Sequence, residues 1–389
     1  MISSACMVVH SYCPDDPRVR REAEALAAAG ARVDVICLRN EGEAREETVG
    51  GVRYLRLPIR RKRGGAARYL FEYGSFLLLA FILATALAMR RRYDVFQAHN
   101  MPDLLVLCGL FHRLRGARVV LDLHDLVPEV YIAKYGLSDE SKLIRALTRV
   151  ESFSIARADA AITTSEAFRR TLIERGIEGS KIHLVLNSPD EKIFPERRPP
   201  RFREDDSFRL IYHGTLVHRS GLDVALRALA LLKDEIPGAL LDAIGDGDGA
   251  EEFARLAREL GIDDRVRFLG HRPLAEIPSH IEAADLGLVP NRRNVFTERN
   301  LPTRIFEYLR MGRPVIASRL PGVLDYYSDE ELLYFEPDDE RDLARAIREV
   351  HDHPEKTRSV MEKGIRVYER HRWEGESRRY LELLQSLGR

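Results

Sequence analysis

The chain has 389 residues, more than a single hydrophobic core usually serves, so we expect two domains. Its 61 basic and 61 acidic side chains cancel, and this balance excludes a general nucleic-acid coat, which needs an excess of positive charge facing the phosphates. Any charged partner must therefore be met by a local cluster of side chains.

The cysteines and the N-terminus both point to the cytosol. Cys6, Cys13, Cys37 and Cys108 stand far apart without a CxxC pair, and three of them fall in strand-like runs. This pattern predicts buried free thiols in a reducing compartment. The first residues, MISSACMVVHSY, lack the basic n-region of a secretory signal and begin a strand at once.

Short runs rich in Val, Ile and Leu alternate with helix-period segments through both halves of the chain. This alternation is typical of parallel sheets covered by helices on both faces. In the first half the predicted strands are 5–12, 32–38, 52–58, 93–99, 117–124, 159–165 and 182–188. In the second half they are 208–214, 239–245, 266–270, 286–290, 314–318 and 332–336. We therefore predict an α/β protein with two doubly wound sheets.

The first helix has clear boundaries in the sequence. Asp16 suits the N-cap position, Pro17 suits the first helical position, and Gly30 suits the end of the helix. Arg18 lies in the first turn, where free backbone N–H groups and the helix dipole favour anions. A solvated helix face explains this arginine equally well.

The boundary between the halves is a proline-rich, charged stretch. Residues 188–207, SPDEKIFPERRPPRFREDDS, contain four prolines and little apolar periodicity, which is typical of an exposed linker. We predict a first domain over 1–195, a second over 200–370, and a helical tail over 371–389.

One segment differs from the soluble pattern. Residues 76–89, FLLLAFILATALAM, form 14 uncharged residues, which is shorter than the ~20 residues of a membrane-spanning helix. Residues 50–70 hold seven Lys or Arg and no acid, and RRR follows at 90–92. Two interpretations stay open: a buried crossover helix with solvated basic flanks, or a segment that lies on a membrane surface.

Ligands bind at the carboxyl ends of parallel strands, so the strand-end loops carry the candidate site. The first strand is followed by SYCPDDPRVRRE without a GxGxxG, which counts against a dinucleotide-binding oxidoreductase. His99 and His124 follow two further strands, and a neutral imidazole there can donate to or accept from a sugar hydroxyl. The alternative for His124 is a local turn cap through Asp125.

Three loops of the second half suit an anionic ligand. The loop HGTLVHRSGLD contains Gly214, His218 and Arg219, and AIGDGDGAEE is another glycine-rich turn after a strand. In ERNLPTRIFEYLRMGRPVIAS, Pro302 or Thr303 begins a helix whose N-terminal amides can hold phosphate oxygens. Glu307 lies one turn on, where it can reach a vicinal diol such as ribose.

In this order the motifs resemble those of a family 4 retaining glycosyltransferase of the GT-B fold. The matching stretches are DPRVRREAEALAAAG, LDLHDLVPE, ITTSEAF, HGTLVHRSGLD, IGDGDG, VRFLGH, AADLGLVP and FEYLRMGRPVIAS, and they cover nearly the whole chain. DLVPE is similar to bacterial members that build polysaccharides or lipid-linked glycans. The resemblance implies an acceptor-binding first domain, a nucleotide-sugar-binding second domain, a C-terminal helix that returns to the first, and no metal.

The resemblance also implies residue roles. His124 matches the histidine near the donor sugar, Glu307 matches the glutamate on the ribose, and Arg272 lies in the loop that meets the base. The expected donor-binding residues are Gly214, Thr215, Arg219, Gly245, Asp246, Gly247, Arg272, Pro302, Thr303, Arg304 and Glu307. The expected acceptor-side residues are Asp16, Arg18, His99 and His124. We take His124, Arg219 and Glu307 as the catalytic set.

Three positions depart from the family pattern. Arg299 stands where the first glutamate of the family pair is expected, with Glu298 beside it. Thr215 and Ser220 replace the cations of the phosphate loop, and Arg219 is the nearby cation able to replace them because a guanidinium suits a diphosphate.

We expect a retaining glycosyltransferase that moves a sugar from a nucleoside-diphosphate sugar to a glycan acceptor without a metal or other cofactor. If the membrane interpretation of 76–89 holds, the acceptor is lipid-linked and the enzyme works at the inner face of the cell membrane. A nucleotide-sugar epimerase of the same fold is one alternative. A non-catalytic subunit that binds a nucleotide sugar is the other.

Overall fold

The computed structural model of the chain describes residues 2–61, 66–196 and 207–388. It divides into two compact units, Met1–Asn187 with Glu374–Arg389 (unit 1) and Ser188–Trp373 (unit 2). The chain thus enters unit 2 before the predicted boundary and returns to unit 1 after residue 373. Half of the predicted linker, residues 197–206, lies outside the described residues.

The described part of unit 1 contains an eight-stranded sheet in the order β3-β4-β2-β1-β5-β6-β7-β8. The strands are β1 Ser4–Tyr12, β2 Arg32–Leu38, β3 Glu46–Val49, β4 Val52–Leu57, β5 Val95–His99, β6 Arg118–Leu123, β7 Ala160–Thr163 and β8 Ile182–Leu184. All neighbours pair in parallel except β3 and β4. β3 was not predicted, because its four residues, EETV, are all exposed and show no apolar pattern.

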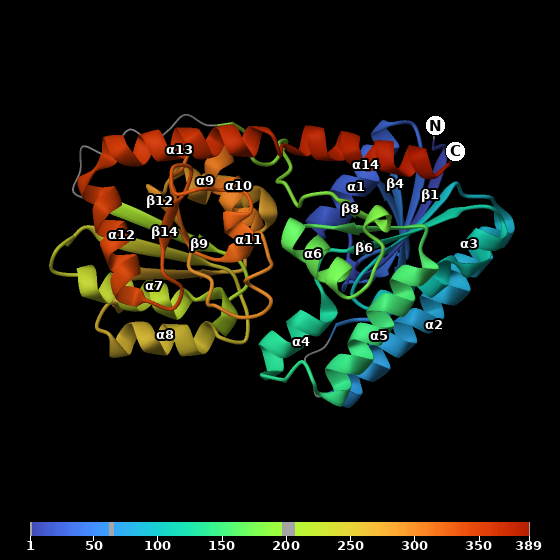
Figure 1. The fold of residues 1–389 in the computed structure, drawn as a ribbon, viewed down its shortest axis with the longest axis horizontal. Helices are drawn as coiled ribbons and strands as arrows, with labels where there is room; N and C mark the ends of the chain where they lie inside the picture. The colour runs from blue at the N-terminus through green and yellow to red at the C-terminus, as the bar shows by residue number, and fades with distance from the viewer. Residues whose placement is uncertain (1, 62–65, 197–206, 389) are drawn as a thin grey trace. The chain divides into compact units, whose positions relative to one another are not determined.

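The helices of unit 1 cover this sheet (Figure 1). They are α1 Pro17–Ala28, α2 Ala66–Arg90, η1 Asp103–Gly109, α3 Leu110–Leu114, α4 Val127–Tyr135, α5 Lys142–Arg157, α6 Glu166–Glu174, η2 Gly179–Lys181 and α14 Trp373–Leu387. The predicted caps of α1 are confirmed: Asp16 accepts from the N–H of Val19 at 3.2 Å, and Pro17 is the first helical residue. The four cysteines are free and buried, as predicted.

Helix α2 contains the apolar run and is much longer than that run. Among the described residues, Phe71–Arg90 forms a stretch of 20 residues that is long and apolar enough to cross a membrane, with a third of its residues buried. The length argument from 14 uncharged residues was therefore wrong, because the helix continues through Phe71–Ser75 and its only acidic residue, Glu72, is buried.

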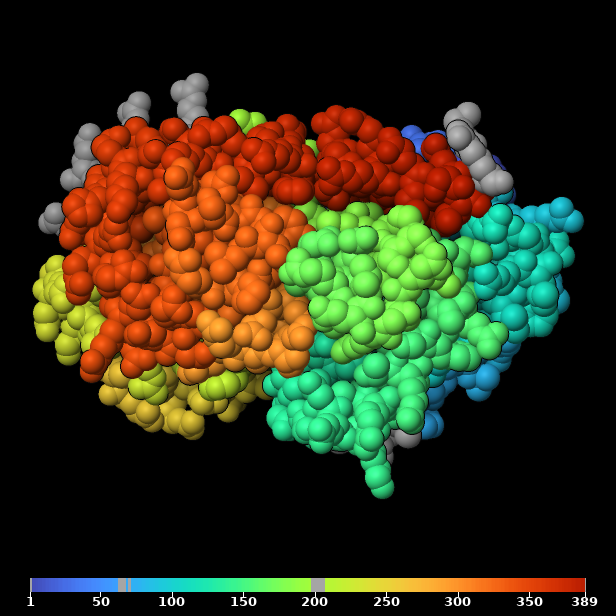
Figure 2. All heavy atoms as spheres, in the orientation of Figure 1, coloured from blue at the N-terminus to red at the C-terminus, as the bar shows by residue number. Residues whose placement is uncertain are grey.

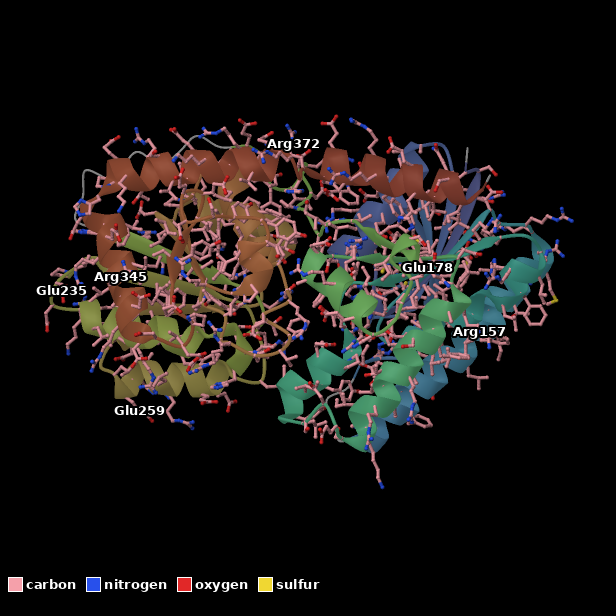
Figure 3. All side chains as sticks on the ribbon, viewed as in Figure 1. Arg157, Glu178, Glu235, Glu259, Arg345 and Arg372 are labelled. Carbon is pink, nitrogen blue, oxygen red and sulfur yellow. The ribbon has the colours of Figure 1, made fainter. Side chains whose placement is uncertain are left out.

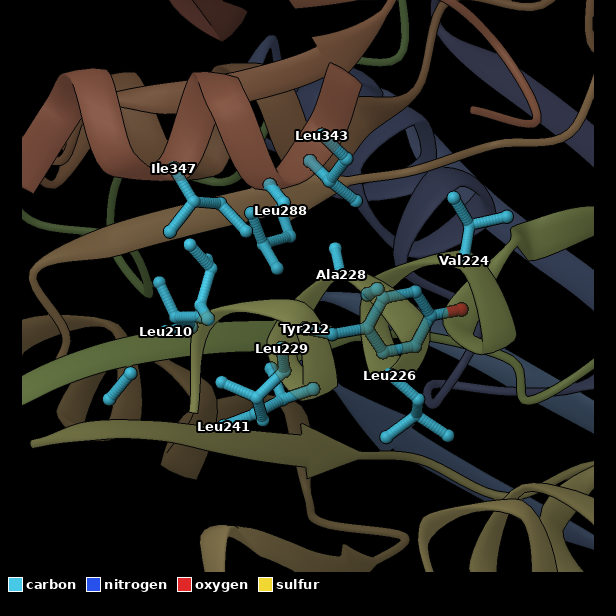
Figure 4. Close-up of a cluster of buried hydrophobic side chains, with 14 of the residues drawn as sticks. Leu210, Tyr212, Val224, Leu226, Ala228, Leu229, Leu241, Leu288, Leu343 and Ile347 are labelled. Atoms are coloured by element: carbon cyan, nitrogen blue, oxygen red, sulfur yellow. The ribbon is translucent and has the colours of Figure 1, made fainter. Parts of the chain in front are cut away.

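Unit 2 contains a six-stranded parallel sheet within residues 207–373, in the order β11-β10-β9-β12-β13-β14. The strands are β9 Phe208–His213, β10 Ala239–Ile244, β11 Val266–Gly270, β12 Leu286–Val289, β13 Val315–Ser318 and β14 Leu333–Phe335. Each lies within a predicted strand. The sheet core includes Leu210, Leu241 and Leu288, which pack against Leu229 of α7 and Ile347 of α12 (Figure 4).

The helices of unit 2 are η3 His218–Ser220, α7 Leu222–Leu232, α8 Ala250–Glu259, η4 Asp263–Arg265, η5 Leu274–Glu276, α9 Ile277–Glu282, α10 Thr303–Arg310, α11 Pro321–Leu324, α12 Glu340–Asp352 and α13 Pro354–Glu369. Their outer faces are charged. Glu259 of α8 and Arg345 of α12 point away from the sheet (Figure 3), as expected for solvated helix surfaces.

Helix α14 belongs to unit 1 from Glu374 onward. Its buried face contains Tyr380, Leu383 and Leu384, and the buried carboxylate of Glu376 accepts from the N–H of Leu186 at 2.9 Å. Its outer face forms part of the surface of unit 1 (Figure 2). The tail therefore completes the core of the first half of the chain.

Candidate active site

In unit 2, three loops meet beyond the carboxyl ends of β9, β10 and β12. The N–H of Leu216 donates to the carbonyl of Asp246 at 3.0 Å, which joins the first loop to the second. The N–H of Arg292 donates to the carbonyl of Arg219 at 3.0 Å, which joins the third loop to the first. These backbone contacts fix the loop 214–221 at the edge of the sheet.

Glycine is required where these loops touch. Gly245 has φ 142°, and a Cβ there would lie 1.8 Å from the carbonyl oxygen of Gly214. Gly221 has φ 69°, and a Cβ there would lie 1.7 Å from the carbonyl oxygen of Pro290. The predicted residues Gly245 and Gly247 thus allow close backbone packing between loops, and Gly247 lies against the carbonyl of Leu216.

Arg304 is a cation held by neutral groups. Its Nη1 donates to the carbonyl of His213 at 2.9 Å and its Nη2 to Oδ1 of Asn291 at 3.0 Å. Its guanidinium lies 4.6 Å from the centre of the Tyr212 ring. In the described part of unit 2 no carboxylate pairs with it, so its positive charge is available to an anion beside Gly214.

Arg219 is the second such cation. Its guanidinium lies 5.7 Å from the centre of the Phe296 ring, and no ion pair is found for it among the described residues. Its neighbour Arg292 is different, because that guanidinium is paired with Asp223 and Asp338. The ion pairs of Arg292 thus hold the loop in place, whereas Arg219 has no such ion pair in the part of the chain that the structure describes.

Glu307 lies on the second turn of α10 and is almost buried. Its Oε2 is 3.1 Å from Nε2 of His213, the last residue of β9. The ring of Tyr308 contacts the edge of the His213 ring at 5.1 Å, and burial raises the pKa of Tyr308. The predicted glutamate therefore lies beside a histidine that the sequence analysis did not consider.

The other predicted donor residues lie at varied places. Thr215 is exposed, and Thr303 stands in the first turn of α10 with Pro302 before it. Asp246 accepts from the N–H of Gly247 at 2.7 Å, a turn contact within its own loop. Arg272 is exposed in the loop after β11. No hydrogen bond or ion pair between Arg272 and the loops at β9 and β12 is found among the described residues.

In unit 1, the two predicted histidines have different environments. His124 follows β6, and its side chain is 27 % exposed. His99 ends β5 and is fully buried, with its Nδ1 2.9 Å from Oδ2 of Asp122. The prediction that His99 faces a ligand was therefore wrong, because its ring turns to the buried carboxylate in the neighbouring strand.

Arg18 was also placed wrongly as a group for an external anion. It is 4 % exposed, and its Nε and Nη2 donate to the two oxygens of Asp122 at 2.7 Å and 2.8 Å. Glu22, one turn on, lies 3.2 Å from the same guanidinium. Asp16 is used as the cap of α1. Of the four acceptor-side residues, His124 is the one with a partly exposed ring and no capping role.

Glu22, His99 and Asp122 offer ligand atoms within 4.8 Å of one another, the spacing of a metal site. The residues do not fit that role, because Arg18 occupies both oxygens of Asp122 and contacts Glu22. Burial would raise the pKa of Asp122, but Arg18 and His99 lower it well below its usual range. We therefore interpret the cluster as a buried ion-pair network.

Sequence reasoning missed His213, Asn291, Tyr212 and Asp122. His213 could have been found, because it precedes Gly214 in the quoted motif and ends a strand. Tyr212 and Asn291 gave no separate signal, since they act by placing Arg304. Asp122 lies inside an apolar strand, and only the parallel pairing of β5 with β6 brings it beside His99.

Comparison with known families identifies both halves. Residues 16–188 match the glycosyl transferase 4-like domain, and residues 194–367 match the glycosyl transferases group 1 domain. A probable glycosyltransferase, WbjE of Pseudomonas aeruginosa, is 27% identical over 70% of each chain. The 2-deoxystreptamine glucosyltransferase of Streptomyces kanamyceticus is 25% identical over 87% of this chain and 89% of its own.

Solved structures show the same fold over the full length. Sucrose-phosphate synthase from Thermosynechococcus elongatus superposes with a TM-score of 0.79 at 21% identity, covering 99% of each chain. HepE of Anabaena, solved in complex with UDP and glucose, gives 0.76 at 17% identity, covering 99% of this chain and all of its own.

These findings give no support to an epimerase. The two family models together account for the chain from residue 16 to residue 367 apart from a short junction. The chain belongs to the glycosyltransferases that join a glycosyl transferase 4-like domain to a glycosyl transferases group 1 domain, and it has their GT-B fold of two parallel-sheet domains.

Proposed function

We propose that this glycosyltransferase takes a nucleoside-diphosphate sugar as donor and transfers the sugar with retention of configuration to a glycan acceptor. The observation that carries the proposal is the pair of arginines, Arg219 and Arg304, at the strand-end loops of unit 2. Both lack a carboxylate partner among the described residues. A diphosphate needs such groups, because its charge must be offset where water is excluded. The UDP complexes of HepE support this donor class.

The donor is held in three parts. Arg219, Arg304 and the free N-terminal amides of α10 offset the charge of the diphosphate. Glu307 accepts from the ribose hydroxyls, and its carboxylate lies beside His213. The loops at Gly214 and Gly245 bring backbone close to the ligand.

No metal is required in this proposal. Two guanidinium groups and a helix N-terminus supply the positive charge that a divalent cation supplies in other transferases. Transfer in excess EDTA should therefore equal transfer with magnesium or manganese. A complete loss of transfer in EDTA that either metal restores would contradict it.

The chemistry then needs no protein nucleophile. As the bond to the diphosphate breaks, Arg219 and Arg304 stabilise the growing negative charge, and a leaving phosphate oxygen takes the proton of the acceptor hydroxyl. His124 of unit 1 accepts a hydrogen bond from a sugar hydroxyl, which orients that sugar. Product analysis by NMR tests this directly, because the new linkage must keep the anomeric configuration of the donor.

The acceptor side of the proposal rests on an apolar surface of unit 1. Along α2 the exposed side chains include Phe71, Leu78, Ile82 and Met89, and the ring of Phe81 lies 6.1 Å from that of Phe111 in α3. Leu110, Phe111 and Leu114 of α3 extend the same surface. We call the exposed side chains of α2 and α3 the α2–α3 surface.

The charges around this surface favour an anionic membrane as its partner. Arg68, Arg90 and Arg115 are exposed on or beside α2 and α3, and the one acid of the two helices, Glu72, is buried. Basic side chains near an anionic leaflet gain about 1 kcal/mol each, and inserted apolar side chains add attraction that salt does not screen. We therefore propose a cytosolic enzyme at the inner membrane surface with a lipid-linked acceptor.

One assay decides the central proposal. Purified protein is screened for thermal stabilisation by nucleotides and nucleotide sugars, and the stabilising donor is then incubated with lipid-linked and free glycan acceptors. We expect transfer to a lipid-linked acceptor. Stabilisation by a donor without transfer to any acceptor would favour the non-catalytic alternative.

A further inference from the structure

The side chains beneath the end of β6 determine how His124 is oriented. The role that we infer for them rests on the function proposed above. We infer that Asp122 is a positioning residue for the transfer reaction: its carboxylate keeps the proton of His124 on Nδ1, so that Nε2 presents its lone pair to a ligand hydroxyl. Asp122 itself is fully buried and touches no ligand.

The backbone around His124 is fixed from both sides. Thr164, after the neighbouring strand β7, donates its hydroxyl to the carbonyl of His124 at 3.2 Å, and Thr163 does the same to Leu123 at 3.1 Å. On the other side, the amide of Asn100 donates to the carbonyl of Asp125 at 2.6 Å. The imidazole therefore leaves a defined point of the backbone, and only its rotamer and tautomer remain to be set.

The two ring nitrogens of His124 face different surroundings. Nδ1 is buried, has no hydrogen-bond partner among the described residues, and lies 4.0 Å from Oδ2 of Asp122. The ring is nevertheless 27 % exposed, so its exposed part lies away from Nδ1. A lone pair on Nδ1 would face a carboxylate oxygen and be repelled, whereas an N–H there is attracted. The geometry favours the proton on Nδ1.

Asp122 can exert this influence because its charge is permanent. Arg18 donates to both of its oxygens, and His99, its register partner in the parallel pairing of β5 and β6, lies 2.9 Å from Oδ2. Burial would raise the pKa of Asp122, but these partners hold it well below the usual range. The charged and titratable groups that face this carboxylate are Arg18, Glu22, His99, His124 and Tyr380.

The tautomer of His124 determines which hydrogen bonds this histidine can make with a ligand. With the proton on Nδ1, Nε2 of His124 is a hydrogen-bond acceptor, so it accepts from a sugar hydroxyl that donates its proton. The opposite tautomer would present an N–H and select a ligand acceptor atom. Asp122 thereby selects for a group that donates a hydrogen bond, such as a donating sugar hydroxyl, without contacting it.

The tautomer can be measured in the wild-type protein. In protein labelled with nitrogen-15 histidine, long-range proton–nitrogen correlation spectra distinguish an N–H on Nδ1 from one on Nε2, and His124→Gln identifies the signal. We expect His124, in its neutral form, to have its proton on Nδ1. A proton on Nε2 would overturn the inference, whatever the activity of any variant.

A double-mutant cycle tests the link to transfer. If Asp122 acts through His124, Asp122→Asn lowers kcat at least about tenfold with donor KM within about threefold, and it lowers kcat no further when His124→Gln is already present. Equal losses from Asp122→Asn in both backgrounds would overturn it. Glu22→Gln is the matched control, because Glu22 is equally buried and also pairs with Arg18 but does not contact His124.

The two kinds of failure are distinguishable. If His124→Gln and His124→Ala both transfer like the wild type, His124 does not serve transfer, and the site in the proposed function fails even with the proton on Nδ1. If those variants lose transfer but the proton sits on Nε2, the proposed function stands and the role of Asp122 fails. If Asp122→Asn does not fold, the tautomer measurement decides alone.

Discussion

Arg219 and Glu307 are the single residues on which donor binding depends most directly in the proposed function. Arg219 has an aromatic contact but no ion pair among the described residues, and Glu307 lies 3.1 Å from His213. Arg219→Ala and Glu307→Gln should each remove a charged hydrogen bond worth about 1.5–3 kcal/mol, which lowers kcat/KM about ten- to hundredfold. The control is Arg227→Ala, which replaces an exposed arginine of α7 and should leave kcat/KM unchanged. Normal donor binding in both site variants would show that the assignment is wrong.

For single residues, the sequence predicted their positions along the helices and strands better than their contacts with other side chains. Glu307 could be placed one turn into a helix from its distance to Pro302. Its contact with His213 could not, because it joins residues far apart in the chain. His99 and Arg18 looked like ligand groups since they follow or open regular elements, but a buried acid, Asp122, draws both inward.

A second residue-scale prediction concerns a buried acid cluster in unit 1. Arg175 donates to Glu151 at 2.7 Å and to Glu129 at 2.5 Å, so one cation serves two nearly buried carboxylates. Burial raises the pKa of Glu151 to about 8, although Arg175 acts to lower it. The folded protein therefore keeps a proton that the unfolded chain releases near pH 4.5.

Glu151 therefore contributes to the free energy of unfolding a term that falls as the pH rises from about 4.5 to about 8, by at most about 1.4 kcal/mol per pH unit. Glu151→Gln keeps an acceptor for Arg175 and removes this titration. We expect the variant to unfold at higher urea than the wild type at pH 7.5, with the difference shrinking toward pH 5. Glu174→Gln, which replaces an exposed acid of α6, should change neither the unfolding midpoint in urea at pH 7.5 nor its dependence on pH. A constant difference across this range would contradict the prediction.

At the scale of elements, the approach of two loops in unit 2 depends on a glycine. Gly221 has φ 69°, and a Cβ there would meet the carbonyl oxygen of Pro290 at 1.7 Å. Gly261 has φ 64°, with nothing within 4 Å of the same position. Gly261→Ala should therefore lose only the backbone preference, about 1–2 kcal/mol, whereas Gly221→Ala must also move the loop.

The measurement is urea unfolding together with donor binding. We expect Gly221→Ala to lose more stability than Gly261→Ala and to weaken donor binding at least about tenfold, since Arg219 and Arg292 meet in the displaced loops. If the two variants lost equal stability and both bound donor normally, the loop contact would have no role in the site.

The elements themselves were largely predictable, and the exceptions have physical reasons. Buried parallel strands are continuous apolar runs, so β1 and β9 stand out in the sequence. β3 does not, because an exposed edge strand has no apolar period. The full length of α2 was missed because Glu72 interrupts the uncharged run, although its carboxylate turns inward toward His10.

The α2–α3 surface gives a prediction for membrane binding. Ile82 and Leu114 are 55% and 72% exposed, and Leu231 of α7 in unit 2 is 47% exposed. In flotation with vesicles of phosphatidylcholine and phosphatidylglycerol, the double variant Ile82→Ser and Leu114→Ser should bind at least about a hundredfold less than the wild type, because each inserted side chain contributes about 1.5–3 kcal/mol. Leu231→Ser should float normally. Salt should weaken wild-type binding without abolishing it.

Wild-type protein that stays wholly in the soluble fraction at low salt would leave the membrane proposal without support. Equal flotation of the double variant and the wild type would show that α2 and α3 do not make the contact. Charge would then be the whole attraction, and high salt should abolish binding completely.

At the scale of the whole molecule, the chain builds two cores but does not finish the first until its last residues. Unit 1 is closed by α14, where Tyr380 donates to the buried amide of Gln97 at 2.6 Å and Glu376 accepts from Leu186. Unit 2 has its own sheet and core within Ser188–Trp373 and contains the proposed donor site. Stability of unit 1 and donor binding by unit 2 should therefore be separable.

Removing residues 374–389 tests this separation. The truncated chain loses three buried apolar side chains of α14, Tyr380, Leu383 and Leu384, together with the partners of Gln97 and Leu186. The exposed core of unit 1 should then melt at a clearly lower temperature, because each large buried side chain contributes about 2–5 kcal/mol. UDP or the identified donor should still raise the melting temperature of unit 2, since none of its proposed contacts lies in the removed segment. Calorimetry of both chains with and without nucleotide measures the two effects together. Loss of nucleotide stabilisation in the truncated chain would show that the donor site needs unit 1, and an unchanged melting profile would show that α14 is not part of the first core.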